Sequence, residues 1–339
     1  MKAIVLSKIG GPELLVPIEV KEPKPGKAEV RIKIHYAGIN YAEILSRKGL
    51  YGWALKRPYI LGMEACGTID ELGSGVSNLK VGQKVMVGTK CGTYAEKIIV
   101  PKERVVPVLD NYSMEESASF LVNYMTAWVC LVKMAKISSV DSVLITAAAG
   151  GVGTAAVQIA SRMGCRVYGM AGSEEKIELI KSYGALGGYN YRDPNCFIDL
   201  MGDTGGVDVV LEMVGGSVFK KSLDVLNPFG RLVVAGFASL DLNKWNPLSW
   251  IQTWRDIPRV NVGRLAQKSV AVMSSHLGYL LEEEPKQMEY ILSDLKDFVK
   301  KHDIKPLIGK VFPFEEASQA HNYIESRKSY GKVLLKIGS

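Results

Sequence analysis

The chain has 339 residues, of which 47% are hydrophobic and 23% charged. This composition excludes a disordered chain and a collagen-like fibre, and the length predicts about two domains. The net charge is +7 and no long run of Lys or Arg occurs, so nucleic acid is not expected as a main partner.

The five cysteines form no C-x-x-C pair, so neither a disulfide framework nor a zinc ribbon is indicated. The first apolar stretch, Met1 to Leu6, is too short for a signal peptide, and no run of 18 uncharged apolar residues occurs. We therefore expect a reduced, cytoplasmic protein. Glycine is the compositional outlier, with 34 residues, about 10% against a usual ~7%.

The first third of the chain is predicted to be rich in β-strands. Apolar and polar residues alternate from Val30 to Tyr36, the pattern of a half-buried strand. Similar short runs lie at Lys84–Val87 and Lys97–Val100. Ser113 to Glu116 resembles a capping box, which predicts a helix that continues through Leu131.

From residue 143 onward, strand and helix patterns alternate, which is typical of a parallel sheet with helices on both faces. The predicted strands are Val143–Ala147, Arg166–Met170, Val207–Leu211, Arg231–Ala235 and Val270–Met273. A helix with an apolar stripe follows from Met288 to Val299, and Lys332–Leu335 returns to a strand pattern. The order β-rich, α/β, β-rich indicates one domain interrupted by another.

A glycine-rich turn joins the first of these strands to a helix predicted over Thr154–Met163. Strand, glycine turn and helix in this order are the context that a dinucleotide-binding motif requires, with the phosphates at the helix N-terminus. Ala148 stands where the first glycine of G-x-G-x-x-G belongs, and the alternative is a purely structural turn. The residues predicted to bind a dinucleotide here are Ala148, Gly150, Gly151, Val152 and Gly153.

The end of the next strand favours NADPH over NADH. Folds that bind NAD commonly place an acid there for the ribose 2′-hydroxyl, but here no acid comes before Glu174. Gly172 leaves room for a 2′-phosphate, to which Ser173 and Lys176 can donate hydrogen bonds. In the alternative interpretation Ser173 only caps the next helix and Lys176 is only solvated; capping and phosphate binding are compatible.

Together these residues resemble the zinc-independent quinone oxidoreductases of the medium-chain dehydrogenase/reductase superfamily, over essentially the whole chain. The matching motifs are Gly38-Ile39-Asn40, Gly49-Leu50-Tyr51, Gly62-Met63-Glu64, Ala147–Gly153, Asn190-Tyr191-Arg192-Asp193 and Gly331–Leu335. Within that group, the segments Leu121–Ala127 and His276–Leu280 are similar to the vesicle amine transport protein branch.

The resemblance implies an α/β fold in which a doubly wound parallel Rossmann sheet is inserted into a GroES-like β-rich catalytic domain. The implied limits are 1–122 and 279–339 for the catalytic domain and 123–278 for the NADPH-binding domain. It also implies that Lys176, Tyr191 and Arg327 hold the 2′-phosphate, and that Thr126 lies near the nicotinamide. A core aromatic, a solvated arginine and a helix hydroxyl are the respective alternatives for Tyr191, Arg327 and Thr126.

Metal ligands are missing where zinc-dependent relatives carry them. Asn40 stands in place of a Cys and Met63 in place of a His, and the region of Asn123 replaces a further Cys. Because a catalytic zinc needs about three protein ligands, no metal is expected.

Without a Lewis acid, conjugate reduction suits the site, with Asn40 and Tyr51 as hydrogen-bond donors to the developing enolate oxygen. Leu45 replaces a tyrosine found in many bacterial quinone reductases.

The leading hypothesis is an NADPH-dependent oxidoreductase that transfers hydride to quinones or α,β-unsaturated carbonyl compounds, as a homodimer. The alternatives are an enoyl-thioester reductase and an NADPH-binding interaction protein at a lipid surface with little catalysis. The segment from Asp241 to Gln267 motivates the last of these, because it combines three tryptophans with four basic residues: Trp245, Trp250, Trp254, Lys244, Arg255, Arg259 and Arg264. A substrate lid and a dimer contact are further roles for that segment.

Overall fold

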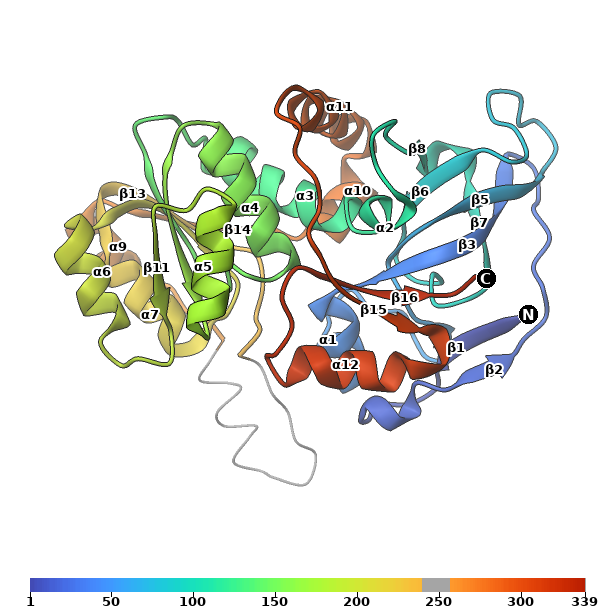
Figure 1. Ribbon diagram of the computed structural model, residues 1–339, viewed down its shortest axis with the longest axis horizontal. Helices are drawn as coiled ribbons and strands as arrows, with labels where there is room; N and C mark the ends of the chain where they lie inside the picture. Colours follow the sequence, from blue (N-terminus) through green and yellow to red (C-terminus); the bar gives the residue numbers. More distant parts are fainter. Residues whose placement is uncertain (240–256, 339) are drawn as a thin grey trace. The chain divides into compact units, whose positions relative to one another are not determined.

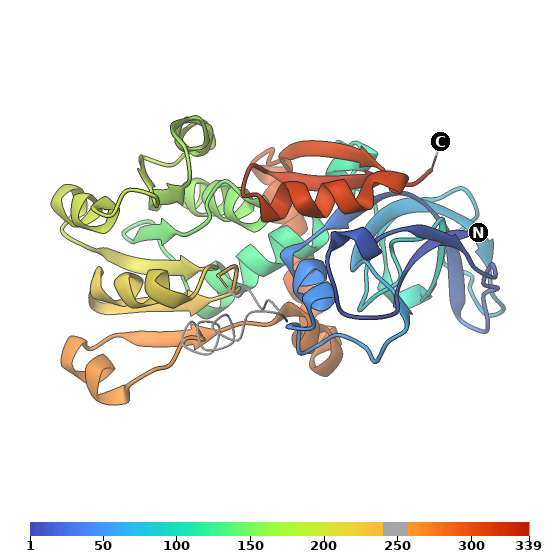
Figure 2. The same ribbon diagram turned by 90° about the horizontal axis from the view of Figure 1, so that it is seen from below.

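The structure is a computed structural model that describes residues 1–239 and 257–338. Its chain divides into two compact units, Met1–Val122 with Lys305–Ser339, and Asn123–Ile304. Figure 1 shows both chain ends, blue and red, in the first unit, and the turned view in Figure 2 places the N and C labels there as well. The predicted insertion of one domain into another is confirmed.

The first unit is built on a seven-stranded sheet with the order β15-β16-β3-β5-β6-β8, in which β7 also pairs with β3. Its strands are β3 (Glu29–Ile39), β5 (Glu64–Leu72), β6 (Lys84–Gly88), β7 (Lys97–Pro101), β8 (Val105–Pro107), β15 (Ile308–Pro313) and β16 (Lys332–Lys336). A smaller sheet holds β1 (Lys2–Leu6), β2 (Pro17–Glu19) and β4 (Tyr59–Ile60), and the helices are α1 (Tyr41–Lys48), α2 (Met114–Ser117) and α12 (Ala317–Glu325).

The core of this unit follows from the predicted alternation in β3. Val30, Ile32 and Ile34 are fully buried, whereas Lys33 between them is exposed. β16 pairs antiparallel with β3 in a register that sets Val333 opposite Ile39. The C-terminal strand therefore lies beside the residues that lead into α1.

The second unit contains a six-stranded sheet, parallel throughout, in the order β11-β10-β9-β12-β13-β14. Its strands are β9 (Ser142–Ile145), β10 (Arg166–Ala171), β11 (Gly187–Asn190), β12 (Val207–Glu212), β13 (Leu226–Val234) and β14 (Ala271–Ser274). Its helices are α3 (Leu121–Trp128, which begins two residues before the unit), α4 (Gly151–Arg162), α5 (Glu174–Ser182), α6 (Cys196–Thr204), α7 (Gly216–Asp224), α9 (Val262–Lys268), α10 (Leu277–Glu283) and α11 (Pro285–Lys301). This is the doubly wound order, which reverses between β9 and β12 and binds ligands outside the carboxyl ends of those strands.

The five strands predicted in this sheet are confirmed, and a sixth, β11, was not predicted. β11 contains Gly187 and Gly188, which are weak strand formers. The Cβ that Gly188 lacks would lie 2.6 Å from Cγ2 of Ile177, so glycine is required there for α5 to pack on the strand. Packing against a helix, rather than local propensity, places this strand.

The helix predicted from Ser113 through Leu131 is interrupted. Its capping box is present, because Ser113 Oγ accepts the Glu116 N–H at 3.1 Å and Glu116 Oε2 accepts the Ser113 N–H at 2.6 Å. However, α2 ends at Ser117, α3 starts at Leu121, and the chain continues in wider π-helical turns over Val129–Met134. The predicted continuous helix was therefore wrong.

α10 and α11 fall in the second compact unit, whereas the predicted domain limits assign residues 279–304 to the catalytic domain. α11 packs on the helix that opens the second unit: the Trp128 and Phe298 ring centroids are 5.0 Å apart, and Lys133 Nζ lies 2.8 Å from Asp294 Oδ2.

The residues described contain no helix that is both long and apolar enough to span a membrane. The three tryptophans of the segment 241–267 lie outside the described residues.

Candidate nucleotide-binding and active site

The glycine-rich turn follows β9 directly and ends at α4. Ala147 adopts a left-handed backbone with φ 48°, and its carbonyl accepts the Gly150 N–H at 3.0 Å. The tight turn that the first glycine of the motif usually makes is thus made one residue earlier. Ala148 is fully buried, and its N–H donates to the Met170 carbonyl at 2.9 Å.

The glycines of the turn allow close backbone approach. A Cβ on Gly153 would lie 2.4 Å from the Ala147 carbonyl oxygen, and one on Gly151 would lie 2.5 Å from Asn123 Nδ2. Gly150 is different, since its nearest contact would be 3.4 Å away and no other neighbour lies within 4 Å. No acidic residue stands in the first turn of α4, and Val152 there is half-buried. A helix N-terminus of this kind binds phosphate groups.

Gly172, Ser173 and Tyr191 meet where β10 and β11 end. The Cβ that Gly172 lacks would lie 2.5 Å from Tyr191 Oη, so the tyrosine closes over the glycine. Ser173 occupies the N-cap position of α5 with extended backbone, but its hydroxyl makes no capping bond. The Ser173 hydroxyl therefore does not cap α5, which was the alternative interpretation. The hydroxyl is available to bind a phosphate.

Two cations stand together beside this strand end. The pKa of Lys176, in the first turn of α5, is lowered by burial and by the positive charge of Arg192. Arg192 was not predicted, although it lies within the Asn190–Asp193 motif next to Tyr191. Its backbone N–H donates to Asn190 Oδ1 at 3.1 Å. Repulsion between Lys176 and Arg192 is relieved when an anion binds between or beside them.

Glu212 is a further buried group at the carboxyl ends of these strands, and the sequence did not single it out. Its Oε1 accepts the N–H groups of Val214 at 2.7 Å and Gly215 at 2.9 Å. Burial raises the pKa of this carboxyl to about 7, and the two N–H groups lower it in part. Nearby, Thr146 Oγ1 accepts the Met213 N–H at 2.9 Å, which ties the ends of β9 and β12 together.

Asn40, in the first unit, belongs to a cluster of buried charges. Its Oδ1 accepts a hydrogen bond from Lys332 Nζ at 2.6 Å, and the same ammonium forms a very short bond with Glu64 Oε1. Glu64 Oε2 in turn accepts the Val122 N–H at 3.0 Å. Lys332 and Glu64 are 2% and 1% exposed, so the pair is fully desolvated.

Glu43 completes the cluster from α1. Its carboxylate accepts the backbone N–H groups of Asn40 and Met63, both at 2.9 Å, and the Asn40 side-chain amide at 3.4 Å. Burial raises the pKa of Glu43 to about 7, with the Glu64 carboxylate acting in the same direction and Lys332 opposing it. Glu64 and Lys332 lie in motifs that carry the family resemblance, but the sequence indicated no role for either, and Glu43 was not singled out.

Tyr51 lies in the loop after α1 and is half-buried. It packs edge-to-face on Trp53, with ring centroids 6.5 Å apart and planes at 86°. Lys90 Nζ lies 4.8 Å from the Trp53 ring centroid. Leu45 is buried in α1.

Thr126 and Arg327 were also predicted site residues. Thr126 is half-buried on α3, between Tyr124 and Trp128, and Tyr124 Oη accepts a bond from Gln158 Nε2 at 2.9 Å. Arg327 belongs to the first unit, where it is exposed just after α12 with φ 58°. Their roles stay predictions.

Potential metal ligands do not gather in the described parts of the chain: across residues 1–239 and 257–338, no three His, Cys, Asp or Glu side chains form a metal-binding group. Cys66 is buried with its Sγ 3.5 Å from Met114 Sδ, and burial raises the pKa of its thiol to about 12. Met63 contributes its backbone N–H to Glu43. Metal independence stays a prediction.

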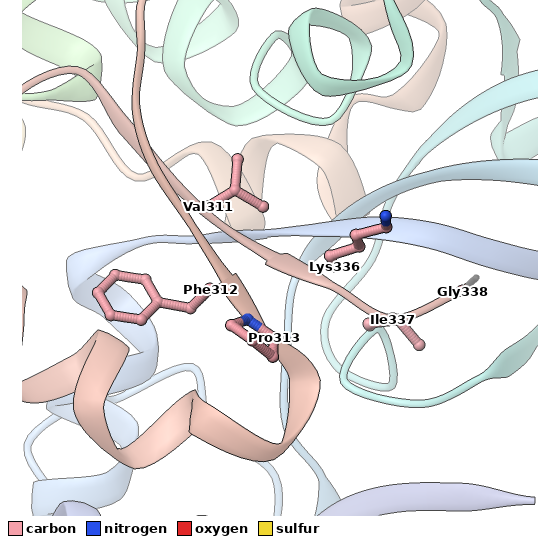
Figure 3. Close-up of a pocket in the computed structure, with 6 residues that line it drawn as sticks. All are labelled: Val311, Phe312, Pro313, Lys336, Ile337 and Gly338. Atoms are coloured by element: carbon pink, nitrogen blue, oxygen red, sulfur yellow. The ribbon is translucent and has the colours of Figure 1, made fainter.

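A hollow lies on β15 and β16, and none of its lining residues is a predicted site residue. Figure 3 shows its lining, which is Val311, Phe312, Pro313, Lys336, Ile337 and Gly338. Lys336 is its one ionisable side chain, so the hollow offers little chemistry. We do not place the active site there.

A GroES-like unit that receives an inserted doubly wound sheet defines a medium-chain dehydrogenase/reductase. The sequence profile of the alcohol dehydrogenase GroES-like domain matches residues 26–110, and that of the zinc-binding dehydrogenase domain matches residues 151–293. The synaptic vesicle membrane protein VAT-1 homolog of Rattus norvegicus is 33% identical over 100% of this chain and 84% of its own length.

Two quinone oxidoreductases are similar to this chain over nearly their whole length. That of Rattus norvegicus is 32% identical over 99% of this chain and 97% of its own. The structure of the Escherichia coli quinone oxidoreductase complexed with NADPH has a TM-score of 0.87 and 28% identity, covering 99% of this chain and 100% of that one. The chain belongs to the branch of this superfamily that holds the quinone oxidoreductases and the VAT-1 homologues.

Proposed function

We propose that the protein is an NADPH-dependent oxidoreductase that reduces quinones or α,β-unsaturated carbonyl compounds without a catalytic metal. The observation that carries the proposal is the pair Lys176 and Arg192 beside a strand end that offers no acid before Glu174. A pair of cations fits the 2′-phosphate that distinguishes NADPH from NADH. The NADPH complex of the Escherichia coli relative supports the same nucleotide.

The residues present fit this cofactor. The N-terminus of α4, with Gly150 open on one side, accommodates the pyrophosphate. Ser173, Lys176, Tyr191 and Arg192 would hold the 2′-phosphate, beside the space that Gly172 leaves. Bound NADPH supplies a hydride from nicotinamide C4.

The chain's own contribution to the chemistry is hydrogen bonding at the substrate oxygen. When a hydride enters the β-carbon of a conjugated carbonyl, negative charge develops on the oxygen. Fixed N–H and O–H donors aimed at that oxygen stabilise the charge by several kcal/mol, about 2.7–4 kcal/mol for one donor in a known case. We propose Asn40 and Tyr51 as these donors, with Thr126 near the nicotinamide.

Initial rates of NADPH oxidation with naphthoquinone, a simple enone and crotonyl-CoA test the proposal. We expect turnover of the quinone or the enone. Turnover confined to crotonyl-CoA supports the enoyl-thioester alternative, and inactivity with all three substrates contradicts both functions.

Lys176→Ala tests the nucleotide preference. The variant should weaken the binding of NADPH far more than the binding of NADH. Equal weakening of both would contradict our assignment of the phosphate pocket.

An interaction protein at a lipid surface is the second candidate, because several relatives are named synaptic vesicle membrane proteins. In the described part of the segment 241–267, Ile257, Val260 and Val262 are exposed. Co-sedimentation with liposomes, compared with a Trp250→Ala, Trp254→Ala variant, tests it. Equal binding by both proteins argues against a lipid contact through that segment.

We also propose a homodimer formed through β14. Among the described strands, β14 pairs only with β13, so its other backbone edge has no partner in the sheet. Light scattering coupled to gel filtration measures the mass in solution. A monomeric mass at micromolar concentration contradicts the dimer.

A further inference from the structure

The cluster around Lys332 joins residues that lie far apart in the sequence. Lys332 follows Asn40 by 292 positions, and the antiparallel pairing of β16 with β3 brings them together. The lysine stem passes directly over Gly38, where an added Cβ would lie 2.7 Å from Lys332 Cε and 2.8 Å from Glu64 Cγ. Glycine at this position therefore leaves room for the buried ion pair.

Asn40 is the one member of the cluster that is not fully buried. Glu43, Glu64 and Lys332 are at most 2% exposed, whereas Asn40 is half-buried. Of the four residues, Asn40 is therefore the one that a ligand can contact. The charged residues lie behind it.

The lysine determines which way the carboxamide faces. An ammonium has only donors, so the Asn40 atom 2.6 Å from Lys332 Nζ must be the oxygen, and the NH2 group points elsewhere. One of the two N–H bonds is directed at Glu43 Oε1, over a long 3.4 Å. The other has no hydrogen-bond partner within the described chain. A charge-assisted bond to the oxygen also polarises the amide, which strengthens its N–H groups as donors.

We infer that Lys332 is a positioning residue, which holds the Asn40 carboxamide so that it presents an N–H donor to the carbonyl oxygen of the substrate. The inference rests on the proposed function and extends it, because it defines the substrate oxygen as a hydrogen-bond acceptor. A purely structural lysine would only neutralise Glu64. The two roles differ in whether the effect of Lys332 depends on Asn40.

A double-mutant cycle separates these roles. Lys332→Met with Glu64→Gln removes both charges of the ion pair, so neither of its members is left as an unpaired buried ion, which favours a folded variant. Glu43, whose pKa is already raised to about 7, keeps its backbone N–H donors. We expect this pair of changes to lower kcat/KM for the carbonyl substrate about 10- to 100-fold, with NADPH affinity unchanged. In an Asn40→Ala background the same two substitutions should change kcat/KM less than about twofold, because the carboxamide that Lys332 positions is absent.

The matched control is another ion pair of the same unit, which joins the buried Arg47 to the partly exposed Glu325. Arg47→Met with Glu325→Gln should leave kcat/KM within about twofold of wild type. An equal loss from the Lys332 pair with and without Asn40, or no loss when Asn40 is present, overturns the positioning role.

A spectroscopic measurement keeps the inference separate from the proposed function. If no substrate is turned over, the proposed function fails, but NMR of asparagine-labelled protein still reports on Asn40. Its side-chain amide signals, assigned by their loss in Asn40→Ala, should shift in the Lys332 pair variant and stay in place in the Arg47 control. Unchanged signals in the Lys332 variant overturn the inference whatever the activity.

Discussion

Gly38 faces Lys332 so closely that a Cβ at position 38 would lie 2.7 Å from the lysine Cε. The same Cβ would lie 2.7 Å from the Ala118 carbonyl oxygen, which belongs to the backbone and has little freedom to move. The ion pair runs from Lys332 on β16 to Glu64 on β5, across β3, and therefore already fills the space over Gly38.

Gly38→Ala should destabilise the protein by about 1–3 kcal/mol, because an overpacked core must shift its neighbours. Urea unfolding measures the change. Gly202→Ala is the matched control: it lies in α6 with nothing within 4 Å of the added Cβ, and alanine there should stabilise by up to about 1 kcal/mol. Equal stabilities of the two variants would contradict the packing argument.

Arg192→Ala should weaken NADPH binding by roughly tenfold and leave NADH binding nearly unchanged, because it removes one charge from the proposed phosphate pocket. Fluorescence titration with each nucleotide gives both dissociation constants. Arg166→Ala serves as the control, since Arg166 is exposed at the opposite end of β10. If the two arginine variants bind NADPH alike, Arg192 is not a phosphate ligand.

His321 makes stability depend on pH. It is fully buried, its Nε2 lies 3.2 Å from Tyr94 Oη, and burial lowers its pKa to about 3, with the charge of Arg47 adding to the effect. Because the folded-state pKa is below the unfolded ~6.5, stability from this group is present above pH 6.5 and is lost as pH falls toward 3. The loss reaches about 2 kcal/mol by pH 5.

His321→Gln keeps a group near Tyr94 but does not titrate. Its free energy of unfolding should fall less than that of wild type between pH 7 and pH 5, by about 2 kcal/mol. Parallel curves for the two proteins would show that His321 does not carry this pH dependence.

Glu212 acts in the opposite sense. Its folded pKa of about 7 lies above the ordinary 4.5, so the folded state holds the proton more tightly and stability falls as pH rises from about 4.5 to 7. Glu212→Gln retains an oxygen for the Val214 and Gly215 N–H groups. The variant should therefore gain stability relative to wild type as pH rises through this range, which urea unfolding at pH 5 and pH 8 detects. A constant difference between the two proteins would rule out this titration.

Much of the nucleotide-binding unit could be predicted from the sequence, because its signals are local. A buried strand, the turn from Ala148 to Gly153 and a helix follow one another directly in the chain. The absence of an acid before Glu174 can likewise be seen within a few residues of the second strand. The charged cluster was not predictable in the same way, since 292 residues separate Asn40 from Lys332 and only the β3–β16 pairing joins them. Two sequence features could have indicated the buried ion pair. Each charged residue stands directly before apolar strand residues, in Lys332-Val333-Leu334 and Glu64-Ala65-Cys66.

Metal independence is tested by exhaustive chelation. Activity after prolonged dialysis against a strong chelator should equal that of the untreated enzyme, because Asn40 and Met63 do not supply zinc ligands. Loss of activity that added Zn²⁺ restores would contradict this prediction.

The most direct test of the central claim is the fate of a deuterium at nicotinamide C4. NADPH labelled there, with each stereochemistry in turn, is oxidised in the presence of an enone, and the product is examined by NMR. We predict that one of the two labelled forms places its deuterium on the former β-carbon, one per NADPH oxidised. Deuterium on the carbonyl carbon, or none in the product from either form, would contradict conjugate reduction by this protein.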